Sequence, residues 1–270
     1  MVGGTPPPPP QQHPASELPR TPRPLRSEDF MGDVVVQRAR QGRPYKFVFK
    51  RKIYLRQFDE ASDDEMFSRL VYLQAADEVI QGNVPLAIED TVVDLTAKSV
   101  AVDLGEDFPT DVDALLEAEV MEYVPVPWRA KYSEEQWAAK VLALRDYGES
   151  DPDELQSQYV NAVSSNELYG THFFHVRKVN DVDAISSLPT NLIAAFNSEG
   201  LHFLDENRRI LMSYGYADIY RWGGSSVQFS LIIWNADTQD TFEMILTTFQ
   251  AADMAALILD FINAIMASTQ

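Results

Sequence analysis

Apolar residues recur at helical spacing between about residues 63 and 166. In the first predicted helix they are four and three positions apart, which places one apolar stripe along one face, and Gly82 with Asn83 can end the helix. The stripe consists of Met66, Leu70, Leu73, Ala76 and Ile80. Four more helices are predicted, over about residues 88–102, 111–124, 133–148 and 152–163. Ser133 with Gln136, and Asp151 with Pro152, supply the start signals of the last two.

After Gly170 the pattern changes to short apolar or alternating runs separated by turn signals. Seven strands are predicted, over residues 173–179, 192–196, 201–204, 210–214, 219–222, 227–234 and 242–249, with a turn at 197–200. A long apolar helix follows over residues 251–266. A helical bundle that precedes a small antiparallel sheet with a terminal helix is an α+β arrangement of two domains.

The first residues have a different composition. Pro6 to Pro10 form an unbroken run and more prolines follow, so we expect residues 1–29 to be a disordered or polyproline II tail. Such a run can also dock on a proline-recognition domain. Aromatic and basic residues then alternate from Tyr45 to Leu55, which indicates an extended, strand-like segment.

Charge is unevenly distributed along the chain, whose net charge is −19. Residues 1–58 hold 11 Lys and Arg against 4 Asp and Glu, a balance of +7, so the remaining residues hold 11 against 37, a balance of −26. An acidic body of this kind repels nucleic acid and anionic lipid. We therefore expect basic peptide segments as partners, no nucleic acid, and at most a peripheral membrane contact.

The 270 residues include no cysteine, which excludes disulfides and thiolate metal sites. No stretch reaches the roughly 20 consecutive apolar residues that cross a bilayer, and the proline run lacks the apolar core of a secretory signal. These features predict a soluble cytoplasmic protein.

Candidate catalytic chemistry is sparse. His172 and His175 are three residues apart on a predicted strand, so they point to opposite faces and cannot hold one ion together. The sequence has no phosphate-binding glycine loop, nucleophile elbow or zinc-ligand spacing. The acidic residues between 103 and 113 lack the ligand positions of a calcium loop. We expect no enzyme activity, no metal and no cofactor.

Five basic residues accompany the extended segment: Lys46, Lys50, Arg51, Lys52 and Arg56. A cluster of this kind can hold inositol phospholipids or nucleic acid. The acidic body that follows in the sequence can satisfy the same charges, and this second interpretation stays open beside the first.

Several stretches together resemble the second and third lobes of a FERM domain. They are Asp64–Asn83, Tyr169–Phe174, Gly200–Phe203 and Ile219–Ser225, followed by Phe229 and Phe249. The closest resemblance is to the version that follows a myosin-tail homology domain in unconventional myosins and in kinesin-like calmodulin-binding proteins of plants. It covers about residues 43–268 and implies a helical lobe like an acyl-CoA-binding bundle, over residues 58–168. Residues 169–270 would form a lobe like a pleckstrin-homology or phosphotyrosine-binding domain, a β-sandwich or barrel with a C-terminal helix.

The resemblance also implies a function. Such modules bind cargo tails, adhesion-receptor tails or cytoskeletal partners, and no reaction is known for them. A complete FERM domain begins with a ubiquitin-like lobe, of which we expect only a remnant and an extended linker, over residues 30–57. No motor domain or P-loop occurs in the sequence, so the motility of the relatives does not carry over.

The terminal helix offers a candidate binding surface. At 100° per residue its widest apolar face is a core-facing stripe made of Met254, Leu257, Ile258, Phe261 and Ile265. Leu259, Ile262 and Met266 extend the apolar arc beyond that face. They can pack on the helical lobe or on a loop. Alternatively they line a peptide groove beside the strand 227–234, with Gln228 and Ser230, as the resemblance implies.

The sequence therefore predicts a non-catalytic FERM-type adaptor that recognises partner tails and links them to the cytoskeleton or to a motor. The alternative is a phosphoinositide-dependent module at the membrane surface, which would use the basic residues from Arg38 to Arg56.

Overall fold

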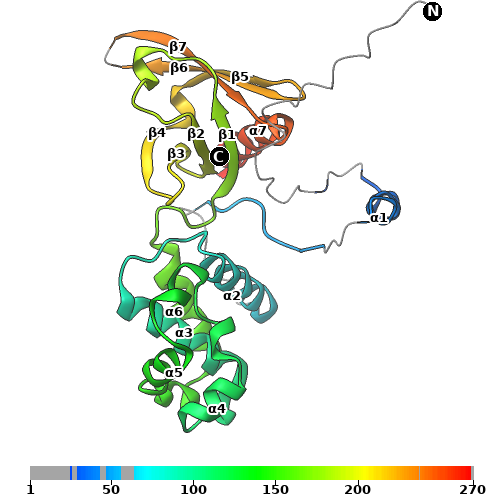
Figure 1. Cartoon of the computed structure of the whole chain (residues 1–270). Coiled ribbons are helices and arrows are strands. Elements are labelled where there is room, and N and C mark those ends of the chain that lie inside the picture. Colours follow the sequence, from blue (N-terminus) through cyan, green and yellow to red (C-terminus); the bar gives the residue numbers. More distant parts are fainter. Residues whose placement is uncertain (1–24, 26–28, 43–46, 56–63, 237, 269–270) are drawn as a thin grey trace, which may run out of the picture. The chain divides into compact units, whose positions relative to one another are not determined.

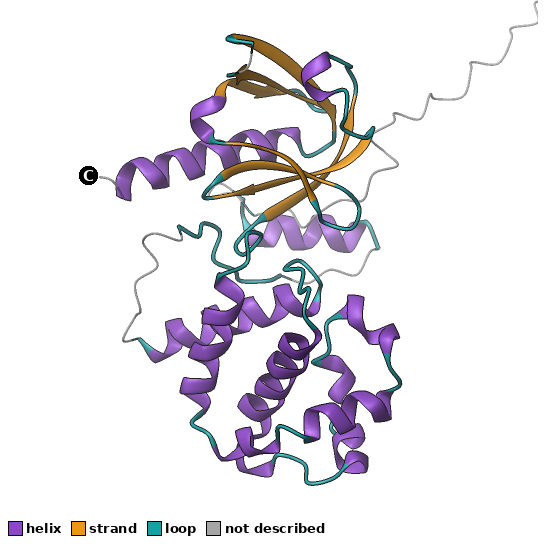
Figure 2. Cartoon of the chain, turned by 90° about the vertical axis from the view of Figure 1, so that its left-hand side faces the viewer, coloured by secondary structure: helices purple, strands orange, loops and turns teal. Residues whose placement is uncertain are grey.

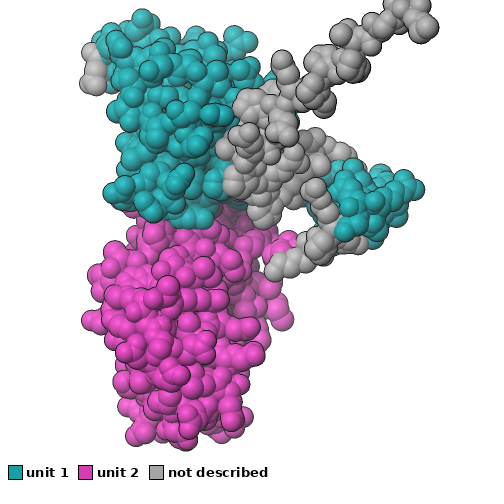
Figure 3. Space-filling model, in the orientation of Figure 1, with its two compact units in different colours: residues 1–47, 172–270 teal, residues 48–171 magenta. Residues whose placement is uncertain are grey.

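The computed structural model describes residues 25, 29–42, 47–55, 64–236 and 238–268. The chain divides into two compact units, which Figure 3 shows in different colours. Residues 48–171 form the helical unit, and residues 172–270, grouped with 1–47, form the unit that contains the sheet. Most of the predicted tail, together with Lys46 and Arg56, lies outside the described residues.

The helical unit contains the predicted helices in the predicted order (Figure 1). They are α2 (Glu65–Ile80), α3 (Glu89–Leu104), α4 (Val112–Glu117), α5 (Glu134–Leu142) and α6 (Pro152–Ser164). Ser133 and Gln136 form the predicted capping box, and the Asp151 side chain accepts a hydrogen bond from the Asp153 backbone N–H.

Two of the predicted helices are shorter than expected. The third ends at Glu117 because Glu119 adopts a left-handed conformation, with φ of 53°, after which only a 3-10 turn (Val120–Glu122) follows. The fourth ends at Leu142 and is followed by a separate 3-10 helix, Arg145–Glu149. The buried residues between these elements, among them Ala97, Leu115 and Val141, form one of the cores of the unit.

The face that α2 turns to the core is not the predicted stripe. Tyr72, Ala75 and Val79 are buried, and Tyr72 packs edge-on against Tyr159 of α6 with ring centroids 5.3 Å apart. Of the stripe, Ala76 is buried and Ile80 is half-buried. Met66, Leu70 and Leu73 are 64%, 41% and 46% exposed. α2 is therefore apolar on two sides, only one of which is covered.

The expected strand-like segment forms no strand among its described residues, 47–55. The backbone of Arg51 instead forms hydrogen bonds with a side chain of α2. The Gln74 carboxamide accepts from the Arg51 N–H at 2.8 Å and donates to the Arg51 carbonyl at 3.0 Å. Buried Tyr54 packs against Tyr169, so an alternating pattern here reflects a chain lying along a helix. The short α1 (Met31–Arg40) precedes this segment, and none of its residues is buried.

Seven antiparallel strands form one sheet, in the order β4-β3-β2-β1-β7-β6-β5 (Figures 1 and 2). The strands are β1 (His172–Lys178), β2 (Asn191–Asn197), β3 (Gly200–Leu204), β4 (Ile210–Tyr214), β5 (Ile219–Gly224), β6 (Gln228–Asn235) and β7 (Asp240–Thr247). Gly200 closes the predicted turn, with φ of 144°; a Cβ at this position would lie 2.1 Å from the Tyr214 carbonyl oxygen, so only glycine fits. The predicted α+β fold is confirmed.

The terminal helix α7 (Ala251–Ser268) packs on this sheet through Met254, Leu257, Ile258 and Phe261, which are buried as predicted, whereas Ile265 is half-buried. Phe229, Leu231 and Ile233 of β6 are fully buried as well. By length and composition α7 is also the one helix among the described residues that could cross a bilayer, a test that the core helix of a soluble protein can pass.

Candidate protein-binding site

The free edge of the sheet next to α7 belongs to β5. β6 pairs with β5 on one side and with β7 on the other, from Gln228↔Thr247 to Asn235↔Asp240, so both of its edges are occupied. A peptide that adds as a strand needs an unpaired edge. A peptide therefore cannot add as a strand directly beside β6, and the free edge of the described sheet next to α7 is one strand further out, at β5.

Gln228 and Ser230 also lie on the other face of the sheet. Side chains alternate along a strand, and the residues between and after them, Phe229 and Leu231, point into the core that α7 covers. Gln228 is exposed and Ser230 half-buried on the opposite face. The structure thus does not bring these two residues together with Leu259, Ile262 and Met266.

β5 packs closely against α7 along a seam where the helix presents two alanines, Ala251 and Ala255. The Trp222 indole N–H donates to the Ala255 carbonyl oxygen at 3.1 Å, which fixes the strand against the helix. Two residues on, a Cβ at Gly224 would lie 3.0 Å from the Cβ of Ala251, so a larger residue there would push the strand and the helix slightly apart. The strand and the helix therefore run in opposite directions, with Gly224 beside the start of α7.

The predicted apolar residues of α7 continue this seam. At 100° per residue, Leu259, Ile262 and Met266 fall within about 80° of Ala251 and Ala255 on the helix circumference. Leu259 is 50% exposed, Met266 is 58% exposed, and Ile262 is half-buried. On the strand, Tyr220 precedes Trp222 by two residues, lies in a bulge of the β5–β6 ladder and is 79% exposed. We call the β5 edge with Tyr220, Leu259, Ile262 and Met266 the β5–α7 seam site.

Sequence reasoning missed Tyr220 and Trp222. Both lie in a run that the sequence predicts as a strand, but hydrophobic alternation does not tell which strand ends a sheet. The exposed aromatic residue next to two glycines, Gly223 and Gly224, was the available signal, because glycine in a strand marks close approach of another backbone.

Two residues of the basic segment are engaged within the helical unit. Lys50 bonds Asp77 at 2.7 Å and Glu78 at 2.9 Å. Burial disfavours the charged Lys50, but the hydrogen bonds to Asp77 and Glu78 outweigh it, and the pKa of Lys50 is raised. The Arg51 guanidinium lies over the rings of Tyr54 and Phe67, 4.7 and 5.8 Å from their centroids. Lys52 is exposed. The acidic neighbours thus satisfy part of the basic cluster.

The described histidines of the sheet have separate surroundings. Among the described residues, no group of three or more His, Asp and Glu side chains could hold a metal ion. The His172 ring lies 6.2 Å from Phe261 on the α7 side, whereas burial and the charge of Arg208 lower the pKa of His175 on the same strand. His202 bonds its cross-strand partner Ser213 at 2.7 Å and buried Asn197 at 3.0 Å.

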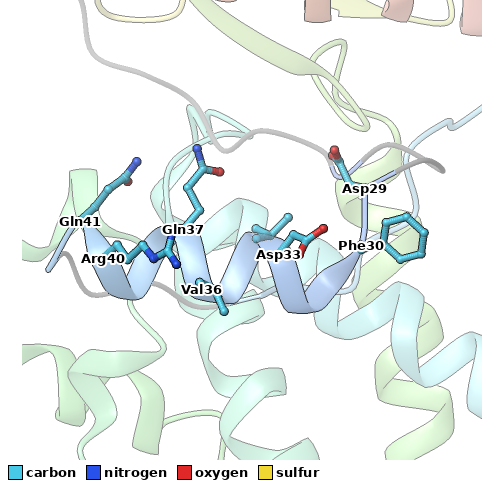
Figure 4. Close-up of a pocket in the computed structure, with 8 residues that line it drawn as sticks. Asp29, Phe30, Asp33, Val36, Gln37, Arg40 and Gln41 are labelled. Atoms are coloured by element: carbon cyan, nitrogen blue, oxygen red, sulfur yellow. The ribbon is translucent and has the colours of Figure 1, made fainter.

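A shallow hollow follows α1 (Figure 4). Its described lining comes entirely from α1 and the residues that flank it: Asp29, Phe30, Asp33, Val34, Val36, Gln37, Arg40 and Gln41. The flank of a single short helix cannot enclose a ligand, so we assign no site there.

Comparison with known proteins supports the two-lobe architecture. Residues 58–174 match the FERM central domain family, and residues 178–266 match the PTB domain of the IRS-1 type. The chain contains the second and third lobes of a FERM domain. FERM domains are non-catalytic adaptor modules.

The relatives of this chain include motor proteins. It is 27% identical to the kinesin-like protein KIN-14I of Oryza sativa over 185 residues, which is 67% of this chain and 14% of the relative. It is 26% identical to unconventional myosin-VIIb of Mus musculus over 184 residues, 65% of this chain and 8% of the relative. The chain thus spans a small part of each relative.

Among solved structures, the C-terminal MyTH4-FERM domain of human myosin 7b in complex with the harmonin-a PDZ3 domain matches 86% of this chain and 46% of its own, with a TM-score of 0.64 and 20% identity. This likeness concerns the fold.

Proposed function

We propose that this FERM chain is a non-catalytic adaptor that recognises the tail of a partner protein and links it to the cytoskeleton or to a motor, in the cytoplasm. The observation that supports this most is the β5–α7 seam site, where an unpaired strand edge lies beside exposed apolar residues of a helix. An incoming peptide would pair its backbone with β5 and place alternate side chains against Leu259, Ile262 and Met266.

Charge supports a basic partner segment. The sheet-containing lobe from residue 169 onward holds 11 Asp and Glu against 5 Lys and Arg, and residues 64–168 hold 23 against 6. Surfaces of one sign steer partners of the opposite sign and raise the association rate. Two of the relatives are motor proteins by name, and one solved neighbour is a complex with a PDZ domain. A protein partner for this chain is consistent with both.

The test uses a display library of cytoplasmic tail peptides, selected on the intact chain and then measured one by one. Leu259→Asp and Met266→Asp place a charge in the seam, and we expect each to weaken a selected peptide about tenfold or more, because an unpaired carboxylate would be desolvated by the peptide. Both positions are at least half exposed, so the circular-dichroism melt should stay near that of the parent. Ile262→Asp should do the same.

The matched control is Val179→Asp, an exposed apolar residue of the same lobe whose backbone N–H donates to Ile245 of β7. Hydrogen exchange gives an independent readout: peptide binding should slow exchange of the amides of residues 219–224. Peptides that bind Leu259→Asp and the parent equally well, with no protection of β5, would rule out the seam. A collapsed melt of Ile262→Asp alone would place Ile262 in the core.

The alternative, a phosphoinositide-dependent membrane module that uses the basic residues between Arg38 and Arg56, would have to draw Lys50 and Arg51 away from their partners in the helical unit.

A further inference from the structure

The exposed stripe of α2 is a second apolar surface, separate from the β5–α7 seam site. Met66, Leu70 and Leu73 fall within about 60° of one another on the helix, on a side different from that of Tyr72, Ala75 and Val79. We call these three residues the α2 stripe. Each of these large apolar side chains would stabilise the protein if it were buried, because its surface would leave water. Natural proteins therefore seldom leave such a row exposed on one helix.

The surroundings extend the α2 stripe. Lys50 ties the extended segment to Asp77 and Glu78 near the end of α2, and the preceding residue, Phe49, is 88% exposed. Half-buried Ile80 continues the stripe by two turns from Leu73. Asp77, bonded to Lys50, lies on the same side between Leu73 and Ile80, so the unbroken apolar stripe runs from Met66 to Leu73, about 11 Å at 1.5 Å per residue. A stripe of this length can contact about two turns of an incoming helix.

The negative charge of the helical lobe favours a partner helix that carries basic residues. Residues 64–168 hold 23 Asp and Glu against 6 Lys and Arg, a balance of −17. Within α2, Glu65 is acidic, Asp77 is already bonded to Lys50, and Arg69 is the one basic residue. A second copy of this chain would bring an equal negative lobe against the first, which repulsion disfavours. A helix with basic flanks is complementary to the surface.

We infer that the α2 stripe is a docking surface for an amphipathic helix with lysine or arginine on both sides of its apolar face, supplied by a partner protein. The apolar face would cover Met66, Leu70 and Leu73, and its basic flanks would meet the acidic lobe. This inference is independent of the proposed function, because the stripe belongs to the other compact unit.

The probe is a synthetic helical peptide of about 18 residues, five turns at 3.6 residues per turn, with leucines on one face and lysines on the others. A second peptide carries glutamate in place of lysine, and a third has the composition of the first with the apolar periodicity scrambled. Affinity for the full chain is measured by fluorescence anisotropy at low and at physiological salt. We expect the lysine peptide alone to bind measurably, with an affinity that falls as salt rises.

The decisive variant is Leu73→Asp. It adds a negative charge, which by itself would favour a cationic peptide, but it also interrupts the apolar stripe. We expect at least about a tenfold loss of affinity, because the apolar face of the peptide would bury the new carboxylate without a partner. The control is Ile88→Asp, which adds the same charge to the same lobe at the exposed N-cap of α3. It should leave the affinity unchanged or slightly higher.

Equal affinities for the parent and Leu73→Asp, or equal binding of the scrambled peptide, would overturn the inference and leave only unspecific attraction. Light scattering that finds the parent dimeric and Leu73→Asp monomeric would overturn it too, because the occupant would be a second copy. If Leu73→Asp fails to fold, Met66→Asp, at the most exposed position of the stripe, decides by the same measurement. Loss of seam binding with stripe binding intact would reject the proposed function alone.

Discussion

Glu89 of the helical lobe pairs with two lysines. Its carboxylate accepts from Lys131 at 2.6 Å, Lys140 at 2.7 Å and the Tyr132 hydroxyl at 2.9 Å. The hydrogen bond from Lys131, followed by those from Lys140 and Tyr132, lowers the pKa of Glu89 from 4.5 to about 2. A carboxylate whose pKa is lower in the folded state stabilises the fold above its unfolded pKa, and this stability is lost as pH falls through the folded pKa.

We therefore expect Glu89→Gln to lower the melting temperature at pH 7. The difference from the parent should shrink between about pH 4.5 and pH 2, where the parent carboxylate itself becomes protonated. Thermal melts followed by circular dichroism over that range measure it. Glu117→Gln, at an exposed position of α4, is the control and should change little at any pH. A Glu89→Gln deficit that stays constant down to pH 2 would contradict the assignment.

At the scale of elements, the seam between β5 and α7 depends on Trp222. Trp222→Phe keeps most of the aromatic volume but removes the donor to the Ala255 carbonyl. The loss of one hydrogen bond of this kind costs about 1 kcal/mol. Urea unfolding should report it, with Trp234→Phe as the control, because Trp234 is 41% exposed on the outer face of β6. A cost no larger than that of the control would mean that the bond does not hold the strand.

The same elements mark the limit of what the sequence predicts. Ser133 with Gln136 and Asp151 with Pro152 predicted two helix starts because caps are local. Seven strands and the core face of α7 followed from periodicity. The edge of the sheet did not, because strand order depends on contacts between distant residues, and Gln228 and Ser230 were therefore placed beside the wrong surface. For α2, apolar on two sides, spacing alone could not tell which row the lobe buries.

At the scale of the whole molecule, the net charge favours the adaptor over the membrane module. Residues 59–270 carry a balance of −26, so an anionic membrane repels most of the chain. Of the basic segment, Lys50 is already bonded to two carboxylates and Arg51 lies over two rings. A membrane surface would have to compete with these partners for the same cations.

We accordingly expect the full chain not to sediment with vesicles of neutral lipid that contain a few per cent phosphoinositide, at physiological salt. Lowering the salt lengthens the Debye length from about 8 Å and should increase repulsion from the acidic lobes rather than binding. Lys52→Glu is the matched variant, because Lys52 is exposed on the described part of the segment. Tight sedimentation that weakens with salt and is lost in Lys52→Glu would favour the membrane module. Unchanged sedimentation in Lys52→Glu would instead assign the contact to basic residues elsewhere, because the acidic lobes offer a membrane no attraction of their own.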